Sequence, residues 1–401
     1  MTPERSGIMN RKHLVTVIVC LFSIFFFGAI GARRRGPENR TLTVGFLYEN
    51  DESTPNTYNF AIARRVLQKT FGERVKILTR SNVRESEADE ILRELAFGGC
   101  DVIFTNSHTT LVPEVARDYP AVEFCQISTR EIGTGDRPEN FHTFNGKIHQ
   151  GWYASGVAAG KKLHELISKK KIRPEEAIVG FVSGYETAEE ISAFTAFLLG
   201  VRSEAPEAVM RVRCTNAQSN YIRERACARA LIAEGCVVVA QHTPTIGPAL
   251  ACEEAAGRVY HIGYSMSMID VATATSLVSA RVNWAPYVTG VVRALLSGES
   301  IEKSVQGDAH GQDLCAGFER GWVDLLDLNE HIAAPGTKER LTEIEQEFAR
   351  GRRKVFVGDY RGIDPENPED VCDLTKGYTE NQDGSWPTFH YILEGIVTVE
   401  H

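Results

Sequence analysis

Short apolar runs alternate with longer amphipathic segments along most of this chain. In the second half, four such runs occupy residues 177–182, 209–214, 237–240 and 259–263, and segments of helical spacing separate them. Runs of this length are typical of strands that are buried on both faces, as in a parallel sheet covered by helices. The pattern therefore predicts an α/β fold built on a doubly wound parallel sheet.

The first half shows the same alternation and predicts a second sheet of the same kind. Parallel sheets gather the residues just past their strand ends along one edge, where open α/β folds bind ligands. Two such edges facing each other would form a ligand-binding cleft. We expect strands at 42–48, 75–78, 102–105, 122–127 and 141–144, and helices at 56–70, from Ser86 onwards and at 113–118.

One long helix, predicted at 150–171, separates the two halves. Because glycines lower helix propensity, several of them in one helix need a packing reason, and close contact between two backbones supplies it. The small residues that share a face of this helix are Gly151, Ala154, Gly156, Ala159 and Gly160.

The chain after residue 263 completes both lobes and then changes character. Strands are expected at 277–282 and 317–325 and helices at 287–296 and 337–349, followed beyond Arg353 by a tail with one strand at 389–399. We divide the chain into a signal or anchor segment (1–40), a first α/β lobe (41–149 with part of 265–300), a second lobe (150–264 with part of 301–350) and a C-terminal extension (351–401).

The charge of the chain argues against nucleic acid as a partner. The 401 residues carry a net charge of −9, and the first 40 residues alone carry +5, which leaves −14 on the remainder. An acidic body of this kind does not attract a phosphate backbone.

The N-terminus has the order of an export signal. Basic residues precede an uncharged apolar stretch at 14–30, and small residues occupy 28–32. This order favours a cleaved secretory signal peptide. The three arginines at 33–35 and the length of the stretch leave a retained membrane anchor open. Either interpretation places the remainder in the periplasm or another extracytoplasmic space.

Eight cysteines follow Cys20. An even number in an oxidising compartment suggests disulfides, and we expect a bridge between Cys315 and Cys372, which lie in loop-like stretches. The alternative is that most cysteines are small buried apolar residues. Apolar segments surround five of them, at Cys100, Cys125, Cys214, Cys236 and Cys252.

No motif for catalysis, a cofactor or a metal ion is present. The sequence lacks a phosphate-binding glycine loop, a G-x-S-x-G elbow and a C-x-x-C pair. Polar and aromatic but uncharged residues follow the predicted strands instead, and they suit a flat, neutral ligand that forms hydrogen bonds. The candidates from this position are Tyr48, Asn106, Ser107, Tyr185, His242, Thr243 and Tyr264.

Several segments resemble the basic membrane protein family, the purine-nucleoside-receptor-like group of ABC-transporter substrate-binding proteins. They include Gln241-His242-Thr243, His261-Ile262-Gly263-Tyr264 and the run from Val282 to Tyr287. The resemblance extends from about Leu42 to Asp324. It implies a type I periplasmic-binding fold, in which two lobes joined by crossover segments capture a purine nucleoside or base, without catalysis, for delivery to an ABC-transporter permease.

The resemblance also implies roles for individual residues. Tyr185 falls where the family has a base-stacking Phe, Ser107 matches a Ser at the third strand, and Trp284 matches a family Trp. Other positions depart from the family pattern and leave the ligand open. Asn56 stands at an aromatic position, with Tyr58 as a substitute, Gln218 replaces a Trp, Pro244 replaces an acid, and Ser267 replaces the acid that would hold ribose hydroxyls.

The function expected from these residues is capture of a small neutral solute by a binding protein. Two alternatives stay open: a membrane-tethered ectodomain that senses a ligand, and a secreted enzyme that processes nucleosides on the same scaffold.

Mass spectrometry of the mature protein distinguishes the soluble form from the tethered one. If the segment at 14–30 is a cleaved signal peptide, the mature chain should begin within residues 30–36. Recovery of a chain that still begins at Met1 would contradict cleavage and favour the anchor.

Overall fold

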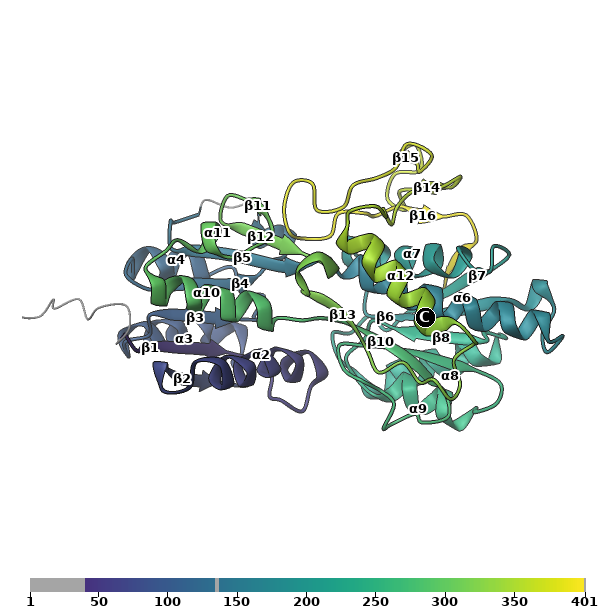
Figure 1. Ribbon diagram of the computed structural model, residues 1–401, viewed down its shortest axis with the longest axis horizontal. Coiled ribbons are helices and arrows are strands. Elements are labelled where there is room, and N and C mark those ends of the chain that lie inside the picture. The colour runs from purple at the N-terminus through teal and green to yellow at the C-terminus, as the bar shows by residue number, and fades with distance from the viewer. Residues whose placement is uncertain (1–39, 134–136, 400–401) are drawn as a thin grey trace, which may run out of the picture. The chain divides into compact units, whose positions relative to one another are not determined.

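Two seven-stranded sheets, which we call sheet A and sheet B, organise the chain (Figure 1). The computed structural model describes residues 40–133 and 137–399, so the predicted export segment at 14–30 lies outside the described residues. In the described ranges, no helix combines the length and apolar character needed to cross a membrane.

Sheet A belongs to the first lobe and has the strand order β11-β12-β5-β4-β3-β1-β2. Its strands are parallel except β11, which pairs with β12 in the antiparallel direction. They are β1 (Leu42–Leu47), β2 (Val75–Arg80), β3 (Val102–Thr105), β4 (Glu123–Ile127), β5 (Phe141–Gly146), β11 (Asp308–His310) and β12 (Asp313–Ala316).

Helices bury both faces of sheet A. Successive side chains of a strand point to opposite faces, so Val102 and Phe104 join one apolar cluster while Ile103 joins another. The first cluster lies under α2 (Pro55–Phe71) and α10 (Ala285–Ser297), and the second lies under α3 (Glu85–Phe97) and α4 (Val112–Asp118). Two short helices, α5 (Arg130–Gly133) and α11 (Ile301–Ser304), complete this lobe.

Sheet B forms the second lobe in the order β13-β10-β9-β8-β6-β7-β17. Only β13 runs antiparallel to its neighbour. The strands are β6 (Ile178–Ser183), β7 (Val209–Cys214), β8 (Val238–Gln241), β9 (Tyr260–Tyr264), β10 (Ser276–Val282), β13 (Val323–Leu326) and β17 (Ile396–Val399); the helices are α6 (Ile148–Ser168), α7 (Ala188–Arg202), α8 (Tyr221–Ala233), α9 (Gly247–Glu254) and α12 (Thr337–Ala349). The α/β prediction is confirmed for both halves of the chain.

Three crossover segments connect the sheets, and they lie side by side. The amide of Lys147, after β5, donates to the carbonyl of Ala316 at 2.9 Å, and the amide of Asn283, after β10, donates to Trp322 at 2.7 Å. Gly146 leaves no room for a side chain, because a Cβ there would contact the side chain of Val282. Adjacent crossovers of this kind form a narrow hinge between two α/β lobes.

The small residues of α6 pack this helix against α7, as the sequence predicted. A Cβ on Gly156 would collide with the carbonyl of Phe197, and one on Gly200 would collide with the carbonyl of Tyr153. Similarly, Gly160 lies against the carbonyl of Val201. The two backbones therefore touch along more than one helical turn.

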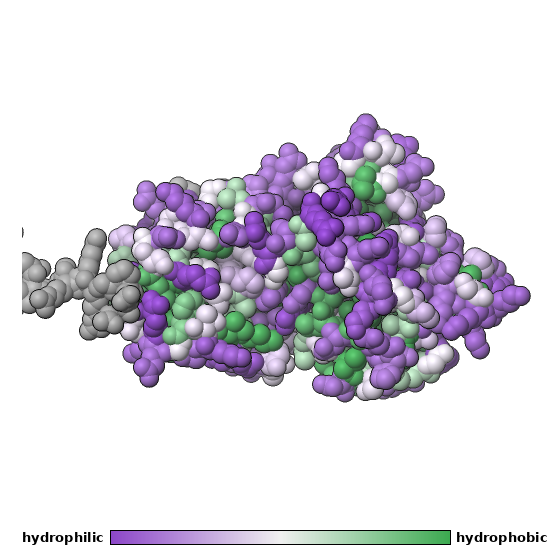
Figure 2. All heavy atoms as spheres, viewed as in Figure 1, coloured by the Kyte–Doolittle hydropathy of each residue, from purple (hydrophilic) through white to green (hydrophobic). Residues whose placement is uncertain are grey.

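The C-terminal extension is folded, whereas the sequence indicated a tail with one strand. It forms a separate sheet from β14 (Arg361–Ile363), β15 (Val371–Asp373) and β16 (Ile392–Leu393), and β17 joins the edge of sheet B. The rings of Phe356 and Phe389 stack 4.1 Å apart within the main core. The surface over α12 and the three-stranded sheet is mainly hydrophilic (Figure 2).

Part of this extension, which we call the strap (residues 380–389), is bonded to both lobes. Glu380 accepts a hydrogen bond of 2.7 Å from Ser192 of α7. Ser385 donates to Asp313 of β12 through both its amide and its hydroxyl, each at 2.6 Å. All four residues are buried. The strap is therefore a connection between the lobes in addition to the three crossovers.

Three local predictions are wrong. The expected strand at 317–325 begins as a 3-10 turn (Phe318–Arg320), because Gly321 adopts a left-handed φ of 66° that interrupts the strand. The helix expected from Ser86 starts one residue earlier, because α3 begins at Glu85 with Arg84 as its N-cap. All eight described cysteines are free. The expected partners belong to different sheets, Cys315 to β12 and Cys372 to β15. Most of the described cysteines are buried, as expected for small apolar residues.

Removing the hydroxyl of Ser385 should weaken the attachment of the strap. Ser385→Ala loses a buried hydrogen bond to a carboxylate, and such bonds contribute about 1.5–3 kcal/mol. Urea denaturation should show this loss in the free energy of unfolding. Ser304→Ala, which removes an exposed serine–carboxylate bond, is the matched control and should change it little. Equal effects of the two substitutions would contradict a special role for the strap.

Candidate ligand site

An aromatic cluster from three elements lies at the carboxyl edge of sheet B. Trp152 comes from α6, His242 follows β8, and Tyr264 ends β9. The rings of Trp152 and Tyr264 stack with centroids 5.5 Å apart. His242 meets the ring of Tyr264 edge-on, with centroids 4.4 Å apart and planes at 87°. These rings form a rigid apolar wall.

Three buried polar atoms beside this wall have no hydrogen-bond partner among the described residues. They are Trp152 Nε1, His242 Nδ1 and Thr243 Oγ1. Burial lowers the pKa of His242 to about 4, so its ring is neutral near pH 7. Most buried polar atoms in proteins are bonded to protein, water or ligand. Their grouping here makes this edge of sheet B the candidate ligand site.

The first turn of α7 adds acidic groups to this edge. Glu189 and Glu190 follow Tyr185, which is 39% exposed in the loop after β6. Desolvation, and then repulsion by Glu189, raises the pKa of Glu190 to about 7. The hydroxyl of Thr187 donates a hydrogen bond to the Glu190 carboxylate. The interpretation that the strand ends are uncharged is therefore wrong on this side.

Charged and polar groups of the first lobe also follow strand ends. The amide of Glu49, after β1, donates to Asn106 Oδ1 at 3.1 Å, and the carboxylate of Glu49 lies 3.2 Å from His108 Nδ1. Ser107, which stands between Asn106 and His108 in the sequence, is buried. Its hydroxyl accepts a hydrogen bond from the amide of Thr109. The pKa of His108 is raised, and the main cause is its hydrogen bond to Glu49.

His108 and Glu189 lie past strand ends of different lobes and influence each other electrostatically. Desolvation raises the pKa of Glu189, and the positive charge of His108 opposes this rise. Glu189 is nevertheless exposed to solvent. A hydrogen bond joins the two lobes directly: the hydroxyl of Ser265, after β9, donates to the carbonyl of Pro55 in α2 at 3.4 Å.

The remaining predicted residues occupy two other environments. Tyr48 and Trp284 are buried in the aromatic core of the first lobe, where both contact Phe60 with ring centroids 5.9 Å away. Tyr48 Oη and Trp284 Nε1 have no partner in the described ranges. The others lie nearer the surface: Asn56 and Gln218 are exposed, Tyr58 lies 5.1 Å from the Arg65 guanidinium, and Ser267 is half-buried.

Sequence reasoning missed Trp152, Glu189 and Glu190. Trp152 stands in a helix of small residues, which is an unusual place for the largest side chain. The two glutamates occupy the first turn of the helix that follows a predicted strand. Helices of this kind begin at the edge where the strands end, so their position in the sequence was a signal for the site.

A sequence-family model described as "ABC transporter substrate-binding protein PnrA-like" matches residues 53–345, which is most of the chain. The chain belongs to this family. The predicted resemblance is therefore confirmed. Members of the family are solute-binding proteins rather than enzymes, they act outside the cytoplasm, and each serves a transporter.

Individual relatives agree with this assignment. The chain is 28% identical over 322 residues to "Purine-binding protein BAB2_0673" of Brucella abortus (strain 2308), which covers 79% of this chain and 83% of the relative. It is 26% identical over 309 residues to "Putative ABC transporter glucose-binding protein TsgA13" of Haloferax volcanii, with 76% and 71% covered.

Solved structures of other substrate-binding proteins share the fold. A solute-binding protein of an ABC transporter system from Conexibacter woesei DSM 14684 has a TM-score of 0.61 at 18% identity, covering 78% of this chain and 98% of that chain. Its counterpart from Aeropyrum pernix K1 has a TM-score of 0.62 at 16% identity, covering 78% and 92%. The family model stops at residue 345, before the C-terminal extension (351–401) begins.

Glu190 should make the stability of this PnrA-like protein depend on pH. A carboxyl whose pKa is about 7 when folded, above its usual 4.5, stabilises the folded state most below pH 4.5. That contribution is lost as the pH rises to about 7. Glu190→Gln should reduce this fall, because Gln does not ionise while Glu189 still does. Thermal denaturation across this pH range would show the change as a flatter dependence of Tm on pH.

The exposed Glu207 supplies a control for this measurement. Glu207→Gln should leave the fall in Tm between pH 4.5 and 7 as it is in the unsubstituted protein. Identical slopes for all three proteins would contradict the raised pKa of Glu190.

Proposed function

We propose that this substrate-binding protein captures a purine nucleoside or purine base between its two lobes and delivers it to an ABC-transporter permease. The observation that carries the proposal is the set of unpartnered polar atoms of Trp152, His242 and Thr243 beside the ring of Tyr264. A purine could supply the missing hydrogen-bond partners through its ring nitrogens. Its flat face could pack against the aromatic side chains of the site.

The charges around the site favour a nucleoside or base over a nucleotide. Glu49, Glu189 and Glu190 line the facing strand ends, and a phosphate there would be repelled. Carboxylates accept strong hydrogen bonds from ribose hydroxyls and from exocyclic amino groups. These glutamates therefore supply the carboxylate acceptors that a serine hydroxyl at position 267 does not provide.

The purine-binding relative from Brucella abortus supports this ligand class. The relative from Haloferax volcanii is named as a glucose-binding protein, and so a monosaccharide is the second candidate. A sugar would also find hydroxyl acceptors in the three glutamates, but it has no aromatic face to pair with the neutral ring of His242. This difference favours the purine.

The mechanism we propose is closure about the three crossovers. A ligand favours the closed arrangement only if it binds that arrangement more tightly than the open one. This is the case when residues of both lobes contact the ligand after closure. His108 and Asn106 would contribute from the first lobe, and Tyr185 and Tyr264 from the second. The residues act by contact alone, so the ligand leaves unchanged.

Tyr185→Ala should reduce affinity for the purine by about 1–3 kcal/mol, the range for losing one base-stacking aromatic ring. A thermal-shift screen across purine bases, nucleosides and monosaccharides would first identify the ligand. At 100 times its dissociation constant a ligand should add about 2.7 kcal/mol to the stability of the protein. Calorimetric titration then measures the effect of the substitution.

Tyr221→Ala is a matched control, because Tyr221 on α8 has the same exposure as Tyr185, 38% against 39%. It should leave the affinity unchanged. Stabilisation by monosaccharides alone would overturn the purine assignment, and equal affinity of the Tyr185→Ala protein would remove Tyr185 from the site.

A further inference from the structure

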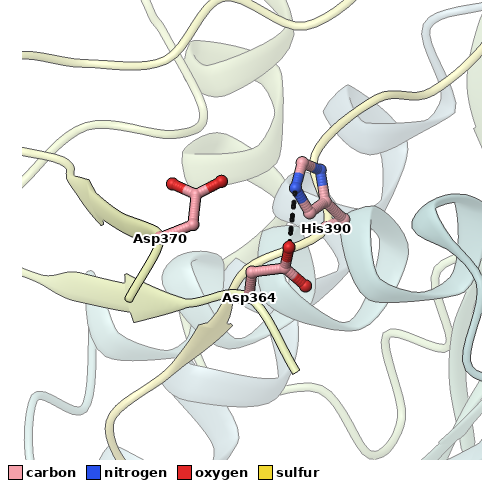
Figure 3. Close-up of side chains that lie close together, drawn as sticks. All are labelled: Asp364, Asp370 and His390. Atoms are coloured by element: carbon pink, nitrogen blue, oxygen red, sulfur yellow. Dashed lines mark ion pairs between the residues drawn. The ribbon is translucent and has the colours of Figure 1, made fainter. Parts of the chain in front are cut away.

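Three side chains with metal-binding atoms converge in the C-terminal extension, far along the chain from the candidate ligand site. Asp364 follows β14, Asp370 precedes β15, and His390 precedes β16. One oxygen from each carboxylate and one ring nitrogen all lie within 4.8 Å of one another. Figure 3 shows the three side chains together, with Asp364 Oδ2 3.8 Å from His390 Nε2.

The hydrogen bond of His390 on its other side directs a lone pair toward the carboxylates. Nδ1 lies 2.8 Å from the carbonyl oxygen of Thr388. A carbonyl only accepts, so Nδ1 carries the proton and the neutral ring has its lone pair on Nε2. Zinc-binding histidines commonly have this arrangement, in which a backbone carbonyl fixes the ring.

Both carboxylates are also held by groups outside the cluster. The amide of Glu366 donates to Asp364 Oδ1 at 2.9 Å, and the hydroxyl of Tyr391 lies 3.3 Å from Asp370 Oδ2. Two carboxylates this close together are stabilised by a positive charge between them, either a proton on His390 Nε2 or a bound cation. A bound cation supplies that charge directly.

The position of the cluster gives such a cation a structural role. The three-stranded sheet contains two strands of three residues and one of two, and each strand has one ligand at its end. Sheets this small have little core of their own and depend on added cross-links. A cation held by Asp364, Asp370 and His390 would join all three strands at one point.

We propose that Asp364, Asp370 and His390 form a structural site for a divalent transition-metal cation, for which Zn²⁺ is the best match. One imidazole and two carboxylates suit Zn²⁺, whereas Ca²⁺ takes oxygen ligands only. With bonds of about 2.0–2.2 Å, tetrahedral ligand atoms lie about 3.3–3.6 Å apart. The 3.8 Å between Asp364 and His390, and the separations of up to 4.8 Å within the set, would shorten to this range by side-chain movement.

The site is tested by titrating Zn²⁺ into the full-length protein after EDTA treatment and dialysis. We expect one equivalent of Zn²⁺ to bind and to raise Tm, and hydrogen exchange of the amides at 361–373 and 390–393 to slow. His390→Gln and Asp370→Asn should each weaken Zn²⁺ binding at least tenfold. The controls are His331→Gln and Glu369→Gln, both exposed and outside the cluster, and they should bind as before.

The exchange measurement uses only the unsubstituted protein, so it stands even if a variant fails to fold. Protection elsewhere in the chain but not at these amides would overturn the site. So would equal Zn²⁺ affinity of the His390→Gln protein. Binding of Ca²⁺ with the same affinity as Zn²⁺ would overturn the choice of a transition metal.

Discussion

The direct contact between the backbones of α6 and α7 is the constraint on which the second lobe depends. Glycines at 156, 160 and 200 leave no volume for a side chain between the two helices. Any larger residue would force them apart, since packed interiors do not yield by the volume of a methyl group without cost. This contact sets where each helix can place its functional side chains.

Both helices contribute to the candidate ligand site, which is why the contact matters for function. α6 brings Trp152 against Tyr264 and His242, and α7 begins with Glu189 and Glu190 at the same edge. A shift of one helix would move the aromatic wall relative to the acidic groups. Sites on rigid elements hold their geometry better than sites on loops. Four groups of the candidate site lie on helices or strands of this lobe: Trp152, Glu189, Glu190 and Tyr264.

The fold was accessible from the sequence because buried strands and amphipathic helices have strong local patterns. The helix at 337–349 was predicted at its observed bounds, and the glycine face of α6 correctly indicated close packing. The extension was not recognised, because Phe356, Phe389 and Leu393 are spaced irregularly and become core residues only through long-range contacts. Similarly, Cys315 and Cys372 belong to different sheets, which spacing does not reveal.

The ligand site was accessible only in part, for a geometric reason. Residues just past strand ends are gathered at one edge, but their sequence positions do not say which point into the core. Tyr48 and Trp284 are buried and pack with Phe60, whereas His242 and Tyr264 are half-buried at the strand-end edge. The pKa of Glu189 depends on the charge of His108, which belongs to the other lobe. No pattern within either lobe encodes that pairing.

The strap limits how the lobes can move, since it is bonded to Asp313 in sheet A and to Ser192 in α7. Rotation about the three crossovers changes the distance between these two anchors unless both lie close to the hinge axis. Ala316 is the last residue of β12, precedes the third crossover and accepts a bond from Lys147 of the first. Asp313 lies three residues before Ala316, so one anchor is near the crossovers. The second anchor is on α7, whose glycine contact with α6 ties it to the crossover after β5. Closure can therefore proceed with the strap in place, provided that the rotation is small and centred on the crossovers.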